Sequence, residues 1–173
     1  MSFIELARTR RSVRTFEERP IEQEKIDLIL EAGRIAPTAA NKQPQRVYVL
    51  QSEGAMAKAR EAAGRMMHNA TCALLVCYDS DESWHGASFG EPGYDGGEVD
   101  AAIVTTSMMM EATDLGVGTL WVRGFNAAKA SEVFGLPANI RPVCFLVLGY
   151  PTEAVLAKPH TARKELGETV TVL

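Results

Sequence analysis

The sequence predicts one layered domain that combines α-helices with β-strands, and two observations support this. Short apolar runs typical of buried strands alternate along the chain with segments of helical periodicity. The chain also has 173 residues, the size of one domain, and neither an internal repeat nor a linker interrupts it. We therefore expect residues 1–173 to fold as a single domain.

The N-terminal part should contain two helices. Ser2 and Glu5 have the spacing of a capping box, so a first helix should begin there and run into a group of arginines. A second helix should follow Pro20 and stop at Pro37. Between the two prolines, the residues at helical spacing are Ile26, Ile29, Leu30 and Gly33.

The remaining elements are expected from shorter patterns. The continuous apolar run 72–78 is typical of a strand buried on both faces. Gly116 should end the long helix that precedes it. The full expected order after the second helix is strand 47–50, helix 55–67, strand 72–78, a long loop 79–97, helix 98–115, strand 119–122, a short helix capped by Asn126, strand 143–148 and a tail, 169–172, that alternates like a strand.

The composition argues against several classes of protein. Three cysteines without a CxxC motif fit neither a disulfide framework nor a thiol zinc site. Eighteen Lys and Arg against 22 Asp and Glu give a net charge of −4, which argues against a nucleic-acid partner. No uncharged apolar run reaches about 20 residues, and the N-terminus carries no apolar leader. We therefore expect a cytoplasmic protein without a membrane partner.

The sequence also lacks the common catalytic motifs. It has no P-loop, no GxSxG elbow and no pair of histidines at metal-ligand spacing, so no metal site is expected. Gly116 and Gly118 lack the third glycine of a dinucleotide turn, and they follow a helix instead of a strand. An enzyme with this sequence would have to take its chemistry from a cofactor.

Four segments, taken in order along the chain, resemble the FMN-dependent nitroreductase family. Residues 10–16, RRSVRTF, resemble its RRSxRxF opening, and residues 36–44, APTAANKQP, are similar to its APSxxNxQP loop. Residues 100–121 are similar to its DAAI…LGLGTxW segment, and residues 148–151, LGYP, match the end of its last strand. The family's basic tail has a counterpart in Arg163 and Lys164.

The resemblance implies a fold, a cofactor and a reaction. The fold would be α+β, with a central mixed, mostly antiparallel sheet flanked by helices, in an obligate-type homodimer with C-terminal exchange. The cofactor would be FMN, which takes hydride from NAD(P)H and reduces a nitroaromatic, a quinone or a similar acceptor by a ping-pong mechanism. Other flavin reactions of the superfamily (reductive dehalogenation, heterocycle oxidation, flavin fragmentation) and a non-catalytic FMN-binding module remain open alternatives.

The resemblance also assigns the arginines to the flavin. It implies that Arg10, Arg11 and Ser12 bind the phosphate or ribityl chain, joined by Arg163 and Lys164 from the tail. Guanidinium groups suit this role because they form paired, charge-assisted hydrogen bonds to phosphate oxygens. Arg14 would reach the pyrimidine edge of the flavin. The alternatives are a basic helix end that complements its own dipole and an ordinary surface arginine.

Two further segments are implied to approach the flavin. Thr38, Asn41 and Gln43 would lie across the dimer interface against the flavin of the other subunit, although turn chemistry is the simpler explanation for such residues. Thr38 replaces the usual serine, and Gln45 stands where an aromatic residue often follows the proline.

The second segment comprises Trp121, Val122, Arg123 and Gly124. By resemblance, the backbone amides of Arg123 and Gly124 would approach flavin N5, and the Trp121 ring would pack in the core. No catalytic side chain is expected, because the flavin would carry the hydride chemistry.

Overall fold

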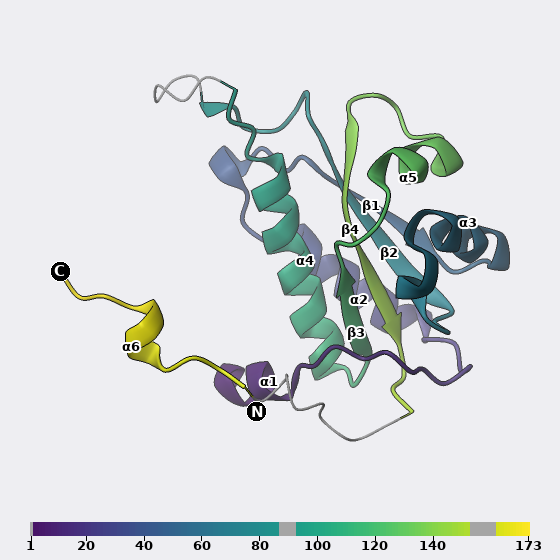
Figure 1. Ribbon diagram of the computed structural model, residues 1–173, viewed down its shortest axis with the longest axis horizontal. Helices are drawn as coiled ribbons and strands as arrows, with labels where there is room; N and C mark the ends of the chain where they lie inside the picture. The colour runs from purple at the N-terminus through teal and green to yellow at the C-terminus, as the bar shows by residue number, and fades with distance from the viewer. Residues whose placement is uncertain (1, 87–92, 153–161) are drawn as a thin grey trace.

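The computed structural model describes residues 2–86, 93–152 and 162–173, and its centre is a four-stranded sheet (Figure 1). The strands lie in the order β1 (Gln45–Leu50), β2 (Cys72–Asp79), β4 (Ile140–Gly149) and β3 (Gly118–Val122), and each neighbouring pair is antiparallel. One parallel bridge, between Ser12 and Thr119, adds the N-terminal segment beside β3. The expected mostly antiparallel sheet flanked by helices is confirmed.

Helices cover both faces of the sheet (Figure 1). Helices α2 (Gln23–Arg34) and α4 (Gly97–Asp114) pack with one core cluster, which includes Leu74 and Val76 of β2. Helix α3 (Glu53–Ala63) and helix α5 (Ala127–Phe134) pack with the other cluster, which includes Leu75 and Cys77. Strand β2 is buried on both faces because its alternate side chains point into the two clusters.

Most predicted elements are present, but one helix ends early. Helix α1 (Phe3–Thr9) begins with the predicted capping box of Ser2 and Glu5. The helix predicted over 55–67 is wrong over its last four residues, because Gly64 adopts a φ of 56° and ends α3. Residues Gly64–Met67 form a separate 3₁₀ turn, η2.

Helix α4 ends where the sequence indicates. Gly116 has a φ of 73°, which a residue without Cβ adopts readily. Its amide donates to the Thr113 carbonyl at 3.1 Å, and the Val117 amide donates to the Ala112 carbonyl at 2.7 Å. This Schellman arrangement satisfies the last carbonyls of α4 and turns the chain into β3.

The tail differs from its prediction. Residues 166–169 form a short helix, α6 (Leu166–Thr169), and residues 170–172 pair with no strand in the described part of the chain. The tail extends away from the body, and Val172 is 93% exposed (Figure 1). The period-2 pattern of 169–172 therefore does not form a strand within one chain.

Residues 87–92 of the predicted loop 79–97 lie outside the described residues.

Several sulfur-containing side chains are buried in the core. Met108 is fully buried beneath α2, where a Cβ on Gly33 would come within 2.7 Å of its Cγ. The three cysteines are buried and unpaired, and burial raises the pKa of Cys72 and Cys77 to about 12 and that of Cys144 to about 11. Such thiols are unreactive at neutral pH.

No described helix has both the length and the apolar character needed to cross a membrane.

Candidate functional site

The N-terminal segment after α1 is fixed against the edge of the sheet. The Val13 amide donates to the Thr119 carbonyl at 2.8 Å, and a Cβ on Gly118 would lie 2.8 Å from Val13 Cγ2. Phe16 is buried over Gly149 and is only 2% exposed. Because Val13 and Phe16 are anchored in the core, the polar side chains between α1 and Phe16 are held at defined positions outside it.

Two predicted phosphate ligands from opposite ends of the chain lie close together. The Arg10 guanidinium is half-buried, and its pKa is lowered first by that burial and then by the positive charge of Arg163. Arg163 is exposed and donates to the Ala162 carbonyl at 2.7 Å. Guanidinium groups suit a doubly charged anion because each can form charge-assisted hydrogen bonds to its oxygens. Lys164 follows in the same exposed segment and adds positive charge to it.

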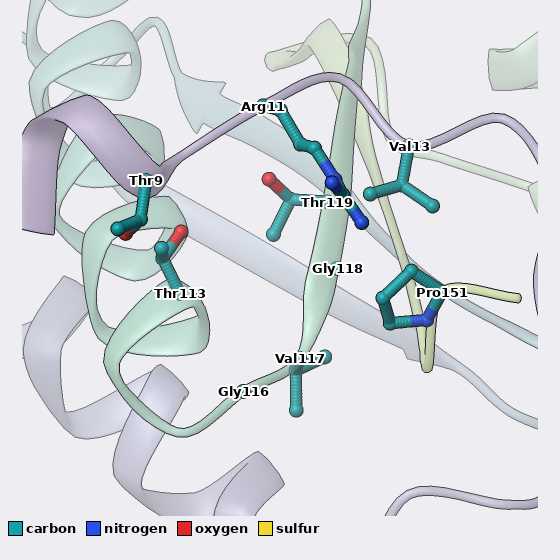
Figure 2. Close-up of a pocket in the computed structure, with 9 residues that line it drawn as sticks. All are labelled: Thr9, Arg11, Val13, Thr113, Gly116, Val117, Gly118, Thr119 and Pro151. Carbon is teal, nitrogen blue, oxygen red and sulfur yellow. The ribbon is translucent and has the colours of Figure 1, made fainter. Parts of the chain in front are cut away.

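Arg11 lines a small cavity of about 170 Å³ at the C-terminal end of α4. Figure 2 shows its side chain directed along β3 toward Thr119 and Gly118, with the hydroxyls of Thr9 and Thr113 at the other end of the cavity. The Thr119 hydroxyl is buried and has no hydrogen-bond partner among the described residues. Such groups are rare in native proteins and commonly hold a water or ligand atom. The cavity therefore lies beside the N-terminal segment and has both polar and apolar lining residues.

Arg14 lies near a residue that sequence reasoning did not select. Burial lowers the pKa of His68 below its usual value, and the positive charge of Arg14 lowers it further. The Asn69 side chain accepts from the Phe16 amide at 3.0 Å and donates to the Phe16 carbonyl at 2.6 Å. This two-bond clamp ties the turn that precedes β2 to the N-terminal segment.

The loop 38–43 is tightly held by its own hydrogen bonds and by α4. Thr38 Oγ1 accepts from the Gln43 amide at 3.0 Å, and the Ala39 amide donates to Asp100 Oδ1 at 2.9 Å. Asp100 is 2% exposed, and its other oxygen has no hydrogen-bond partner in the described residues. The loop contains the short turn η1 (Ala39–Asn41). Three of its residues have positive φ: Ala40 at 50°, Asn41 at 54° and Gln43 at 51°.

Within one chain, this loop and the N-terminal arginine segment lie at opposite ends of α4. The loop is bonded to Asp100 in the first turn of the helix, whereas Arg11 lines the cavity beside Gly116 just after its last turn. An 18-residue helix is about 27 Å long. Within one protomer, the exposed side chains of Asn41 and Gln43 therefore lie far from Arg10 and Arg163.

The segment after β3 carries the remaining predicted residues. Val122 is buried in the core, and Trp121 packs against the layer formed by α2 and α4. The Arg123 side chain donates to the Val143 carbonyl at 2.6 Å and forms an ion pair with Glu98 of α4. Gly124 is exposed, and a Cβ placed on it would meet no atom within 4 Å. The backbone at Gly124 is thus accessible from solvent.

Sequence reasoning did not select His68 or Asn69. Asp100 opens the quoted segment 100–121, but its hydrogen bond to the Ala39 amide was not expected. Asn69 and Asp100 act on the backbone of distant segments, and the sequence contains no sign of either contact. The described residues contain no cluster of histidine, cysteine or carboxylate side chains suited to a metal ion.

Known proteins resemble this chain over nearly its whole length. The model of the nitroreductase family matches residues 7–68 and 59–150. A crystal structure of a nitroreductase family protein from Clostridium difficile 630 superposes with a TM-score of 0.91 at 37% identity, covering 99% of this chain and 98% of that chain. A Bacillus subtilis protein named as an NAD(P)H FMN reductase is 30% identical, over 94% of this chain and 71% of its own length. A Desulfovibrio desulfuricans structure in complex with FMN has a TM-score of 0.84 at 23% identity, covering 100% of this chain and 97% of that chain.

Proposed function

Because this chain belongs to the nitroreductase family, we propose that it is an FMN-dependent oxidoreductase that oxidises NAD(P)H and reduces a small organic acceptor. The names of its relatives support this proposal: one is an NAD(P)H FMN reductase and another, from Vibrio harveyi, an NADPH-flavin oxidoreductase. The acceptor that we propose is a nitroaromatic compound or a quinone.

The observation that carries the proposal is the approach of Arg10 to Arg163. Burial lowers the pKa of Arg10, and the positive charge of Arg163 lowers it further. A phosphate monoester between them would replace repulsion with charge-assisted hydrogen bonds, each contributing about 1.5–3 kcal/mol. The donor set therefore fits FMN, which ends in such a phosphate, better than it fits an uncharged cofactor.

Each predicted residue then has a role toward the cofactor. Arg10, Ser12 and Arg163 hold the phosphate, with Arg11 and Lys164 adding positive charge nearby. Arg14 lies beyond them on the anchored segment, where a cation stabilises negative charge on the pyrimidine side of the ring. At the reacting edge, the backbone amides of Arg123 and Gly124 would be the contacts, since the Arg123 side chain is bound to Glu98 and to the Val143 carbonyl. When bound, FMN supplies the hydride chemistry itself.

We propose further that the working unit is a homodimer. The separation of loop 38–43 from the paired arginines is bridged if the loop of one protomer meets the cofactor of the other. Helix α4 also exposes apolar side chains, Val99 at 52% and Ile103 at 38%, which a second protomer would cover. The extended tail, with its exposed Leu166 and Val170, would pack on the partner. Sedimentation analysis should therefore give a dimer, and a flavin-loaded monomer would contradict it.

The test of the function is direct. The purified protein should bind FMN, and anaerobic mixing with NADH or NADPH should bleach the flavin absorbance near 450 nm. Adding a nitroaromatic compound or a quinone should then restore the oxidised spectrum. A protein that ignores added FMN would contradict the proposal, whereas FMN that neither nucleotide reduces would favour a non-catalytic binding module.

A further inference from the structure

The side chain of Arg123 is held at two points beside the exposed backbone of Gly124. Its Nη1 donates to the Val143 carbonyl of β4 at 2.6 Å, and its Nη2 forms an ion pair with Glu98 Oε1 in the first turn of α4. Val143 is buried in the sheet, so its carbonyl is a fixed point. The Arg123 guanidinium is therefore held against β4 and α4.

The backbone that follows Arg123 is fixed as well. The Phe125 amide donates to the Arg123 carbonyl at 3.0 Å, and the Asn126 amide donates to the Ala62 carbonyl at 2.9 Å. The amide of Gly124, which lies between these contacts, donates to no described residue. An exposed and unused donor between fixed neighbours is suited to a preorganised contact with a ligand.

Helix α4 has other groups that support its first turn. The side chains of Arg123 and Glu98 are 55% and 56% exposed, and exposed ion pairs stabilise proteins only slightly. A carboxylate in the first turn complements the helix dipole, but Asp100 lies in the same turn. Asp95 Oδ1 also accepts from the Gly97 amide at 2.9 Å. The position of Glu98 is better explained by the charge of its partner.

The charge of Arg123 is close enough to act on a ligand bound at Gly124. The two residues are adjacent, and one side chain is shorter than the Debye length of about 10 Å at 0.1 M ionic strength. An uncompensated guanidinium would therefore attract anionic acceptors and stabilise negative charge on a reduced flavin. Glu98 cancels this charge through the ion pair.

We infer that Glu98 is a positioning residue that acts through Arg123. It holds the guanidinium beside the Val143 carbonyl and neutralises it, so that the reacting edge presents backbone amides and the site takes uncharged acceptors. This inference rests on the proposed function. It adds to that function a class of acceptor, neutral nitroaromatic compounds and neutral quinones, and it names the residue that sets this class.

A series of isosteric variants separates the charge of the ion pair from its shape. Glu98→Gln leaves an uncompensated positive charge, Arg123→Gln leaves a negative one, and the double variant is neutral like the wild type. The midpoint potential of bound FMN is measured by anaerobic reduction against a reference dye. Glu98→Gln should raise it by about 10–20 mV, which corresponds to a shift of about twofold to fivefold in the ratio of reduced to oxidised flavin. Arg123→Gln should lower the potential, and the double variant should return close to the wild-type value.

The second experiment tests the class of acceptor. The value of kcat/KM is measured for p-nitrobenzoate and p-nitrobenzamide, which are similar in shape but differ in charge. The wild type should prefer the amide, and Glu98→Gln should raise the ratio of benzoate to benzamide by about twofold to fivefold. Arg123→Gln should lower this ratio, and the double variant should again resemble the wild type. Higher ionic strength should reduce these differences, because salt screens exposed charges.

Glu132→Gln is the matched control. It removes a carboxylate from an exposed ion pair with Lys129 on α5, so it should leave both the potential and the acceptor ratio unchanged. A change as large as that of Glu98→Gln would show that the effect does not depend on Arg123, and would overturn the inference.

The remaining outcomes distinguish this inference from the proposed function. A wild-type protein that does not bind FMN overturns both. If FMN is bound and reduced, but Glu98→Gln has the potential and the acceptor ratio of the wild type, the role of Glu98 alone is overturned. A double variant that deviates as far as Glu98→Gln would mean that the ion pair acts through its shape, and the charge argument would fail.

Discussion

Strands β2 and β4 lie in the middle of the sheet with nearly all of their side chains buried, whereas the loop 38–43 and the turn at His68 hold every non-glycine residue with positive φ in the described chain. The strands follow the ordinary rules of local structure. The two strained segments break those rules, and the loop contains Thr38, Asn41 and Gln43, which we propose to lie near the cofactor of a second protomer. The difference indicates that the sheet supplies stability and that the strained segments give up part of it, as is common at functional sites.

The largest effect should come from the sheet. Phe145 is fully buried in β4 and lies edge-on to Phe125, with ring centroids 5.1 Å apart. Phe145→Ala should lower the free energy of unfolding by about 3–5 kcal/mol, because it removes a large side chain and leaves a cavity. Urea denaturation measures this change, and a loss below about 1 kcal/mol would show that the centre of the sheet is not the main source of stability.

A smaller loss is expected where α4 holds the strained loop. Asp100→Ala removes the acceptor of the Ala39 amide, and we expect a loss of about 1–3 kcal/mol in the same denaturation experiment. Amide hydrogen exchange of residues 38–43 should accelerate with it. Unchanged exchange in the loop would mean that its own hydrogen bonds hold it without Asp100.

The same substitution, Ala→Gly, should change the stability of the protein in opposite directions in the strained loop and in a regular helix. Ala40 has a φ of 50° in the loop, whereas Ala57 is exposed within helix α3. Ala40→Gly should stabilise the flavin-free protein by about 1 kcal/mol, because glycine accepts positive φ. Ala57→Gly should destabilise it by about 1 kcal/mol. The melting temperatures of the two variants should lie on opposite sides of the wild type, and shifts in the same direction would refute strain in the loop.

The smallest effect concerns pH. The pKa of His68 is lowered from 6.5 by burial and by Arg14, so the folded state resists protonation more than the unfolded chain does. The stability associated with His68 is therefore complete above pH 6.5 and decreases as the pH falls below that value. His68→Gln should remove this part of the pH dependence. The same slope in both proteins between pH 7 and pH 5 would contradict the lowered pKa.

The elements of the fold could largely be predicted from the sequence, because periodicity and capping are local. The run 72–78 indicated a strand buried on both faces, and Gly116 indicated the end of α4. The helix predicted over 55–67 failed because alanine-rich periodicity does not show that Gly64 takes a positive φ. The prediction of a strand over 169–172 was wrong, because a period-2 pattern cannot show whether a partner strand exists within the chain.

The candidate site was predictable to a smaller extent. A resemblance in sequence motifs suggested Arg10 and Arg163, and the structure places their charges close together. The Asn69–Phe16 clamp, which holds the N-terminal segment, joins residues 53 positions apart in sequence and leaves no local pattern.

Calorimetric titration of the flavin-free protein with FMN and with riboflavin tests the central claim most directly, since the two ligands differ only in the phosphate. The wild type should prefer FMN strongly. Arg10→Ala and Arg163→Ala should each lose about tenfold to 100-fold in FMN affinity while binding riboflavin as before. Arg8→Ala, which removes an exposed arginine from the last turn of α1, should keep the wild-type preference. An Arg10→Ala protein that still prefers FMN to the same degree would show that the two arginines do not hold the phosphate.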